Sequence, residues 1–115
     1  MKKIILVLIL SIIGIGAQAQ EKTNNKNAEV VFKTSGNCDM CKKRIEKAAF
    51  SVKGIKNAEW LVDDQEIYLI IDENKCTKED VAKAIAKAGH DNAMAKTSDE
   101  TYDALHGCCQ YKRTE

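Results

Sequence analysis

Two cysteines three positions apart, Cys38 and Cys41, are the side chains of this sequence best suited to metal or redox chemistry. The first lies in a loop after Gly36, and the second lies on the first turn of a helix predicted over residues 39–52. Their sulfur atoms can therefore converge on one point, beside the free N–H groups of a helix N-terminus, which favour thiolate over thiol. Two close thiolates suit a soft cation: Cu(I) fits, as does Hg(II) or, with more ligands, Zn(II).

The same pair is compatible with a second chemistry. A CxxC motif at a helix start is also typical of thioredoxin-like thiol–disulfide oxidoreductases, which use the same lowered thiol pKa. In that fold a cis-proline faces the active site, and this chain has no proline, so redox catalysis ranks second. A disulfide between Cys38 and Cys41 would close too short a loop to add much stability. We expect it only as an oxidised resting form.

A second pair of cysteines, Cys108 and Cys109, lies in a C-terminal extension that begins at Ser98. Three interpretations are open. The pair folds back toward Cys38 and Cys41 as additional ligands, or it forms a separate soft-metal site, or it belongs to a mobile tail whose thiols oxidise or pair with another chain. Adjacent cysteines do not readily form an unstrained disulfide with each other, and we favour metal binding.

Alternating strands and helices are predicted from residue 29 onward. Strands are indicated by β-branched residues or strict apolar alternation, and helices by apolar residues at helical spacing. Thr77, with Asp80 three residues later, has the pattern of a helix N-cap. The predicted elements are a strand over 29–35, a helix over 39–52, a hairpin of strands over 55–62 and 67–71, a helix over 78–88, and a weaker strand over 91–97 with Ala93 and Ala95 facing inward.

This β-α-β-β-α-β order is that of the ferredoxin-like sandwich, an α+β fold in which two helices cover one face of a four-stranded antiparallel sheet. A domain of about 70 residues has a small core with little room for a buried cleft, so we expect the chemistry in the loops. Cys76 precedes the second helix, at the end of the sheet opposite the Cys38 loop. It is expected to be a half-buried structural residue rather than a ligand.

The N-terminus has the pattern of a secretory signal peptide, with a cationic start, an apolar run to Ile15 and small residues before a cleavage site at Ala19. The apolar run is shorter than the ~20 residues of a membrane span, so we expect export to the periplasm or the medium, with no span after cleavage. The expected organisation is a signal peptide over 1–19, a flexible leader over 20–28, one domain over 29–97 and a C-terminal extension with vicinal cysteines over 98–115.

The charge balance excludes some functions. The 115 residues include 18 Lys and Arg against 17 Asp and Glu, a net charge of +1, which provides no basic footprint for nucleic acid. The sequence also offers no general base, activated hydroxyl or phosphate-binding loop, so no enzymatic turnover is expected. A basic run at Lys42, Lys43, Arg44 and Lys47 is either a solvated helix face or a surface that steers docking onto an acidic partner.

Three segments carry a resemblance to a known family. They are Gly36-Asn37-Cys38-Asp39-Met40-Cys41 followed by a basic helix, Val52-Lys53-Gly54-Ile55, and Ala86-Lys87-Ala88-Gly89-His90. Over roughly residues 30–97 the chain resembles the heavy-metal-associated domains, which include copper chaperones, metal-binding domains of copper-exporting ATPases and periplasmic mercuric-ion binding proteins. The resemblance implies the ferredoxin-like fold, a bis-cysteine metal site at Cys38 and Cys41, and handover of the metal to a partner by ligand exchange.

Two positions depart from the family pattern. Gly36 stands where the family often has a methionine that supports the metal loop from beneath, and Met40 lies inside the motif instead. His90 stands where the family commonly has an aromatic residue in a loop bordering the metal site. It is either a third ligand or a solvent-facing loop histidine.

The sequence therefore predicts an exported soft-metal-binding protein, in the first place a copper(I) chaperone or scavenger. Cys38 and Cys41 are the predicted primary ligands, and Cys108, Cys109 and His90 are conditional ones. A metal-transporting ATPase or another metal-handling protein is the expected partner. The alternatives are a thiol–disulfide oxidoreductase that uses the same CxxC motif, and a zinc(II) or mercury(II) binder.

Overall fold

Three strands and two long helices form the framework of the protein, in a computed structural model that describes residues 24–113. In chain order they are β1 (Ala28–Lys33), α2 (Asp39–Phe50), β2 (Ile55–Leu61), β3 (Glu66–Ile71) and α3 (Lys78–Lys87). Two short pieces follow, α4 (Asp99–Asp103) and the 3-10 helix η2 (Gly107–Cys109). The predicted signal peptide over residues 1–19 lies outside the described residues.

The strands form one antiparallel sheet in the order β1-β3-β2. The predicted hairpin is confirmed as β2 and β3, which pair with Ala58 opposite Leu69 and Trp60 opposite Ile67. Successive residues of a strand point to opposite faces. Ile67 and Leu69 are accordingly buried against the helices, whereas Tyr68 between them is exposed.

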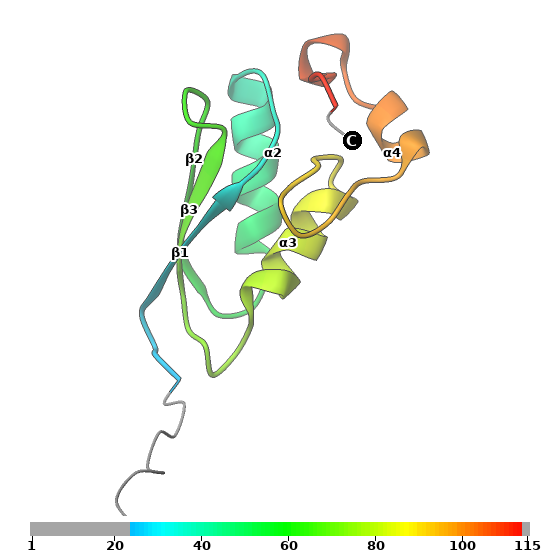
Figure 1. Ribbon diagram of the computed structural model, residues 1–115. Helices are drawn as coiled ribbons and strands as arrows, with labels where there is room; N and C mark the ends of the chain where they lie inside the picture. Colours follow the sequence, from blue (N-terminus) through cyan, green and yellow to red (C-terminus); the bar gives the residue numbers. More distant parts are fainter. Residues whose placement is uncertain (1–23, 114–115) are drawn as a thin grey trace, which may run out of the picture.

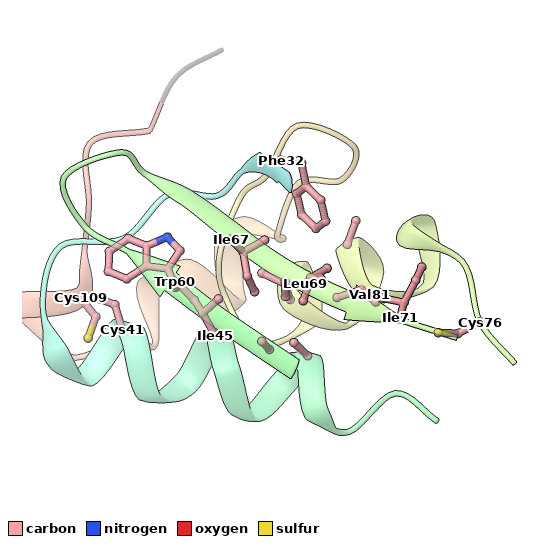
Figure 2. Packing of buried hydrophobic residues seen from close by; sticks show 14 residues of the cluster. Phe32, Cys41, Ile45, Trp60, Ile67, Leu69, Ile71, Cys76, Val81 and Cys109 are labelled. Carbon is pink, nitrogen blue, oxygen red and sulfur yellow. The ribbon is translucent and has the colours of Figure 1, made fainter. Parts of the chain in front are cut away.

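Both long helices cover the same face of the sheet (Figure 1). Their apolar stripes, which include Ile45 on α2 and Val81 and Ile85 on α3, are fully buried in one core with the inward residues of the sheet (Figure 2). Each such side chain contributes about 1.5–3 kcal/mol of hydrophobic stabilisation. Among the described residues, no helix has both the length and the apolar character needed to span a bilayer.

The predicted fourth strand over residues 91–97 does not form. Asn92 makes one isolated antiparallel bridge just beyond β1, flanked by two backbone hydrogen bonds of 2.9 Å. The Asn92 side-chain oxygen then accepts from the N–H groups of Met94 and Ala95, at 3.1 and 3.0 Å. Such an Asx turn competes with strand pairing for the backbone groups. Ala93, predicted to face inward, is exposed, while Ala95 packs against the core.

The C-terminal segment, which we define as residues 98–113, returns to the end of the molecule where α2 begins (Figure 1). Ser98 is the N-cap of α4, and its Oγ accepts from the Thr101 N–H at 3.2 Å. After α4 the chain crosses to η2, which carries the vicinal cysteines. The C-terminal segment is therefore part of the folded structure of the described residues.

The N-terminus of α3 provides a test of the fold. Thr77 and Asp80 form a capping box, in which the Asp80 N–H donates to Thr77 Oγ1 at 3.2 Å and the Thr77 N–H donates to Asp80 Oδ2 at 2.9 Å. Thr77→Ala should lower the free energy of unfolding by about 1 kcal/mol in urea denaturation. The matched control is Lys78→Ala, at the next, exposed position, which should change it by less than about 0.5 kcal/mol. Equal losses in the two variants would contradict the capping box.

Candidate metal centre

The loop between β1 and α2 is held by hydrogen bonds from the β2–β3 hairpin. Trp60 Nε1 donates to the carbonyl of Thr34 at 2.9 Å, and the Gly36 N–H donates to Oε1 of Gln65 at 3.1 Å. α2 then begins with Cys38 as its N-cap residue. The second cysteine of the motif falls on the first helical turn, as the sequence predicts.

The side chain of Trp60 fills the space beneath this loop. Its ring is 1% exposed. A Cβ atom on Gly36 would come within 2.9 Å of ring atom Cζ2 and within 3.1 Å of the Cβ of Cys41. The close approach of the ring therefore requires glycine at position 36, and the loop is supported from beneath by a residue of β2. Sequence reasoning missed this role of the chain's one tryptophan.

Four sulfur atoms lie together at this loop. The Sγ of Cys38 lies 3.8 Å from that of Cys41, 3.6 Å from that of Cys108 and 3.8 Å from that of Cys109. The sulfurs of Cys108 and Cys109 are 3.9 Å apart. The Sγ atoms of Cys38, Cys108 and Cys109 all lie within 4.8 Å of one another, a grouping that can hold a metal ion. These distances exceed the ~2.05 Å of a disulfide, and all five cysteines are free thiols.

The sulfur cluster (Cys38, Cys41, Cys108 and Cys109) is buried on one side and open on the other. Cys41 and Cys109 are fully buried at one end of the core (Figure 2), whereas Cys38 is half-buried and Cys108 is exposed. Met40, whose orientation the sequence left open, is 44% exposed, and its Sδ accepts from the Cys108 thiol at 3.6 Å. An open groove of about 400 Å³ borders Cys38. An incoming ligand can reach Cys38 through this groove.

The thiols differ in how readily they ionise. The backbone N–H of Cys41, at the start of α2, lowers the pKa of the Cys38 thiol to about 7, and burial only partly opposes this effect. Burial raises the pKa of the Cys41 thiol to about 11. Burial likewise raises the pKa of the Cys109 thiol. Cys38 is therefore substantially ionised at neutral pH in the metal-free protein, while Cys41 is protonated.

Tyr111 docks the C-terminal segment onto the loop that follows α3. Its ring is buried, and its hydroxyl donates to the carbonyl of Gly89 at 2.9 Å and accepts from the Asp91 N–H at 2.8 Å. The ring stacks on His90 with centroids 5.5 Å apart. The backbone carbonyl of Tyr111 accepts a hydrogen bond from the Tyr102 hydroxyl. The vicinal cysteines, the second of which lies two residues before Tyr111, are fixed in position by these contacts.

Arg113 holds the same segment in place through an ion pair with Asp91. Its guanidinium donates to both carboxylate oxygens of Asp91, at 2.8 and 3.1 Å, to Asp99 Oδ1 at 2.8 Å and to the carbonyl of Thr97 at 2.8 Å. It also lies over the ring of Tyr102, 5.0 Å from the centroid. Burial alone would raise the pKa of the Asp91 carboxyl, but the hydrogen bonds from Arg113 and the Thr97 N–H lower it. Sequence reasoning missed both anchors, Tyr111 and Arg113.

His90 is fully buried, so its interpretation as a solvent-facing histidine is wrong. The physical reason is that the ring of Tyr111 covers it. Its Nδ1 lies 2.8 Å from the carbonyl of Ser35, and its Nε2 has no hydrogen-bond partner. Burial lowers the pKa of the imidazole, which is neutral at pH 7. The ring nitrogens of His90 are not among the atoms grouped within 4.8 Å around Cys38.

Cys76 lies at the opposite end of the core from Cys41 and Cys109 (Figure 2). It is 6% exposed, and its thiol contacts the carbonyl of Asp72 at 3.9 Å. Burial raises the pKa of this thiol. As the sequence predicts, the structure places this cysteine in the core and apart from the sulfur cluster.

Comparison with known proteins finds its matches among solved structures; no family model and no curated protein matches the sequence. The whole of the CopZ metallochaperone aligns with 57% of this chain, at 21% identity and a TM-score of 0.55. Oxidized MerP from Ralstonia metallidurans CH34 aligns over 94% of its length and 58% of this chain, at 22% identity and 0.55. The N-terminal domain of a potential copper-translocating P-type ATPase from Bacillus subtilis, in the Cu(I)-loaded state, aligns over 92% of its length and 64% of this chain, at 22% identity and 0.56.

These likenesses confirm the predicted resemblance at the level of the fold. The chain shares the fold of these proteins, with two helices on one face of a three-stranded antiparallel sheet and a bridged loop where a fourth strand was predicted. Because the whole of CopZ aligns with only 57% of the chain, part of residues 24–113 has no counterpart in it.

The environment of Cys38 predicts selective reactivity in the reduced, metal-free protein. The rate at which iodoacetamide alkylates Cys38 should rise with pH through a midpoint near 7, because the helix N-terminus stabilises its thiolate. Peptide mapping by mass spectrometry after brief exposure measures this rate. Cys76 is the internal control and should react slowly across the same range, because it is buried. A midpoint for Cys38 near the ordinary thiol value of ~8.5 would contradict the electrostatic role of α2.

Proposed function

We propose that this protein binds a soft metal ion through Cys38 and Cys41 and carries it, without enzymatic turnover. Copper(I) is the proposed cargo. The observation that carries this conclusion is the contact of the two sulfurs, 3.8 Å apart, at the N-terminus of α2. There one thiol is already substantially ionised near neutral pH.

The chemistry of the donor set supports copper(I). Thiolates are soft ligands that select Cu(I) over harder divalent ions. Two of the structures with the same fold are described as a CopZ metallochaperone and as a Cu(I)-loaded domain. Zinc(II) and mercury(II) are the competing ions, since both also bind thiolates.

We propose that the ion leaves by ligand exchange with a partner protein. The half-buried Cys38 beside an open groove of about 400 Å³ gives an incoming thiolate a route to the metal. Lys43 and Lys47 are exposed on α2, the helix that carries Cys41, and supply positive charge for docking an acidic surface. A metal-transporting ATPase, or another metal-handling protein, is the proposed partner.

Export is part of the same proposal. It rests on the signal-peptide pattern of residues 1–19 and places the protein in the periplasm or outside the cell. Unpaired thiols in such a compartment tend to oxidise. A bound soft cation protects them, which is consistent with a carrier or scavenger that is loaded with metal.

A thiol–disulfide oxidoreductase is the second candidate, and one observation favours it. Cys38 has a low thiol pKa and Cys41 a high one, as in a pair made of an attacking and a resolving thiol. Two further thiols in contact with Cys38 favour metal binding instead, because a redox pair needs only two.

Titration of the reduced protein with Cu(I), against a chromophoric Cu(I) chelator, tests the proposal. We expect about one tightly held ion per chain, and loss of that binding in the double variant Cys38→Ser/Cys41→Ser, which removes both soft donors. Cys76→Ser is the matched control and should bind Cu(I) like the parent protein. Unchanged binding in the double variant would rule out the proposed site. Catalytic reduction of a model disulfide by the metal-free protein would instead favour the oxidoreductase.

A further inference from the structure

We propose that Cys108 and Cys109 are also metal ligands, so that the C-terminal segment closes the CxxC pair into a centre of four sulfur atoms. The inference rests on the proposed function and adds to it a ligand set and a coordination number. The C-terminal segment lies beyond the residues that carry the family resemblance, which end at Thr97.

The spacing of the sulfurs fits a single ion. When thiolates surround an ion as a tetrahedron at ~2.3 Å, neighbouring sulfurs lie about 3.8 Å apart. In the sulfur cluster, Cys38 lies 3.8, 3.6 and 3.8 Å from the other three sulfurs, and the vicinal pair is separated by 3.9 Å. Cys38, Cys108 and Cys109 can therefore enclose an ion as they stand. Cys41 touches Cys38 but lies outside the group of sulfurs that are all within 4.8 Å of one another, so its side chain must turn toward the ion to become the fourth ligand.

The backbone of η2 turns both vicinal sulfurs toward the same place. The Cys109 N–H donates to the carbonyl of His106 at 2.8 Å, and the Tyr111 N–H donates to the carbonyl of Cys109 at 2.9 Å. In this turn both Cys108 and Cys109 contact Cys38. A disulfide between adjacent cysteines is strained. Cys108 and Cys109 are accordingly two free thiols in this turn and are not bonded to each other.

The anchors hold this turn in place before any ion arrives. Tyr111 is buried under two hydrogen bonds of its hydroxyl, and Arg113 binds Asp91 in a bidentate ion pair. A ligand segment that is already ordered loses little conformational entropy when it binds. The anchors therefore act as positioning residues for the two vicinal thiolates.

The cluster also has a cation beside it. Arg44, three residues after Cys41 on α2, is half-buried beside Cys109. Its Nη1 is buried without a hydrogen-bond partner. Several thiolates around one Cu(I) carry excess negative charge, and a half-buried guanidinium with a free donor compensates part of it. This arrangement suits a charged sulfur centre better than a set of neutral thiols.

Closure of the site by the C-terminal segment changes how firmly it holds a metal ion. Two thiolates alone leave a Cu(I) ion accessible to a partner, whereas three or four thiolates retain it and also satisfy ions that prefer tetrahedral coordination. A partner must then displace Cys108, the exposed ligand, before it takes the metal. The structure in this way favours retention of the ion over fast exchange.

Titration with Cd(II) and with Cu(I) tests the inference. The near-ultraviolet charge-transfer absorbance of bound Cd(II) scales with the number of thiolate ligands. In Cys108→Ser/Cys109→Ser it should fall to about half, because two of four thiolates remain. Retention of Cu(I) against a chelator should weaken by at least about tenfold. The single variant Cys108→Ser, at an exposed position, repeats the test without altering the buried core, and Cys76→Ser is the control.

The outcomes separate this inference from the proposed function. If the tail variants keep the full absorbance and Cu(I) retention while Cys38→Ser/Cys41→Ser loses both, the four-sulfur centre is wrong and the CxxC carrier stands. If all of these variants bind as the parent does, both proposals fail. Circular dichroism of each variant establishes that the fold is intact.

The positioning role has its own measurement. Arg113→Ala keeps every sulfur but removes one of the two anchors of the C-terminal segment, so Cu(I) should dissociate faster to the chelator by about tenfold, while the Cd(II) absorbance at saturation stays unchanged. Lys112→Ala, at the neighbouring exposed position, is the matched control. An unchanged dissociation rate in Arg113→Ala would overturn the positioning role of the anchor.

Discussion

The packing of Trp60 beneath the β1–α2 loop is the contact on which the sulfur cluster depends. The ring closes against Gly36, Nε1 holds the carbonyl of Thr34, and the backbone N–H donates to Glu46 on α2 at 2.9 Å. One residue of β2 thereby fixes the end of β1 and the start of α2 relative to each other. The size of the indole ring sets the distance between the β1–α2 loop and the core. The direction of Cys38 follows from the helix that begins there.

Local signals in the sequence predict most of the fold. The hairpin alternation, the Thr77 cap and the helical spacing after Cys38 all depend on residues a few positions apart, and each has its element in the structure. The predicted fourth strand fails for an equally local reason that periodicity does not reveal. The Asn92 side chain offers its own oxygen to the backbone N–H groups that follow, and strand pairing stops after one bridge.

The metal site likewise has one part that local sequence signals predict and one part that they do not. The CxxC spacing and the helix N-terminus are local, so the sequence places Cys38 and Cys41 together. The vicinal cysteines reach them across about 70 positions, through anchors whose partners near Asp91 lie 20 or more positions earlier. No spacing or periodicity relates Tyr111 to the loop that it covers. The burial of His90 is a consequence of that docking, and for the same reason the sequence alone could not decide between its interpretations.

The ion pair of Arg113 with Asp91 makes the end of the chain a structural necessity. Asp91 is only 4% exposed, and without the guanidinium its buried carboxylate would keep only the Thr97 N–H as a partner. Removal of the whole C-terminal segment would also take away Tyr111, whose ring covers His90. A version cut back to the length of CopZ would therefore be an impaired protein rather than a minimal one.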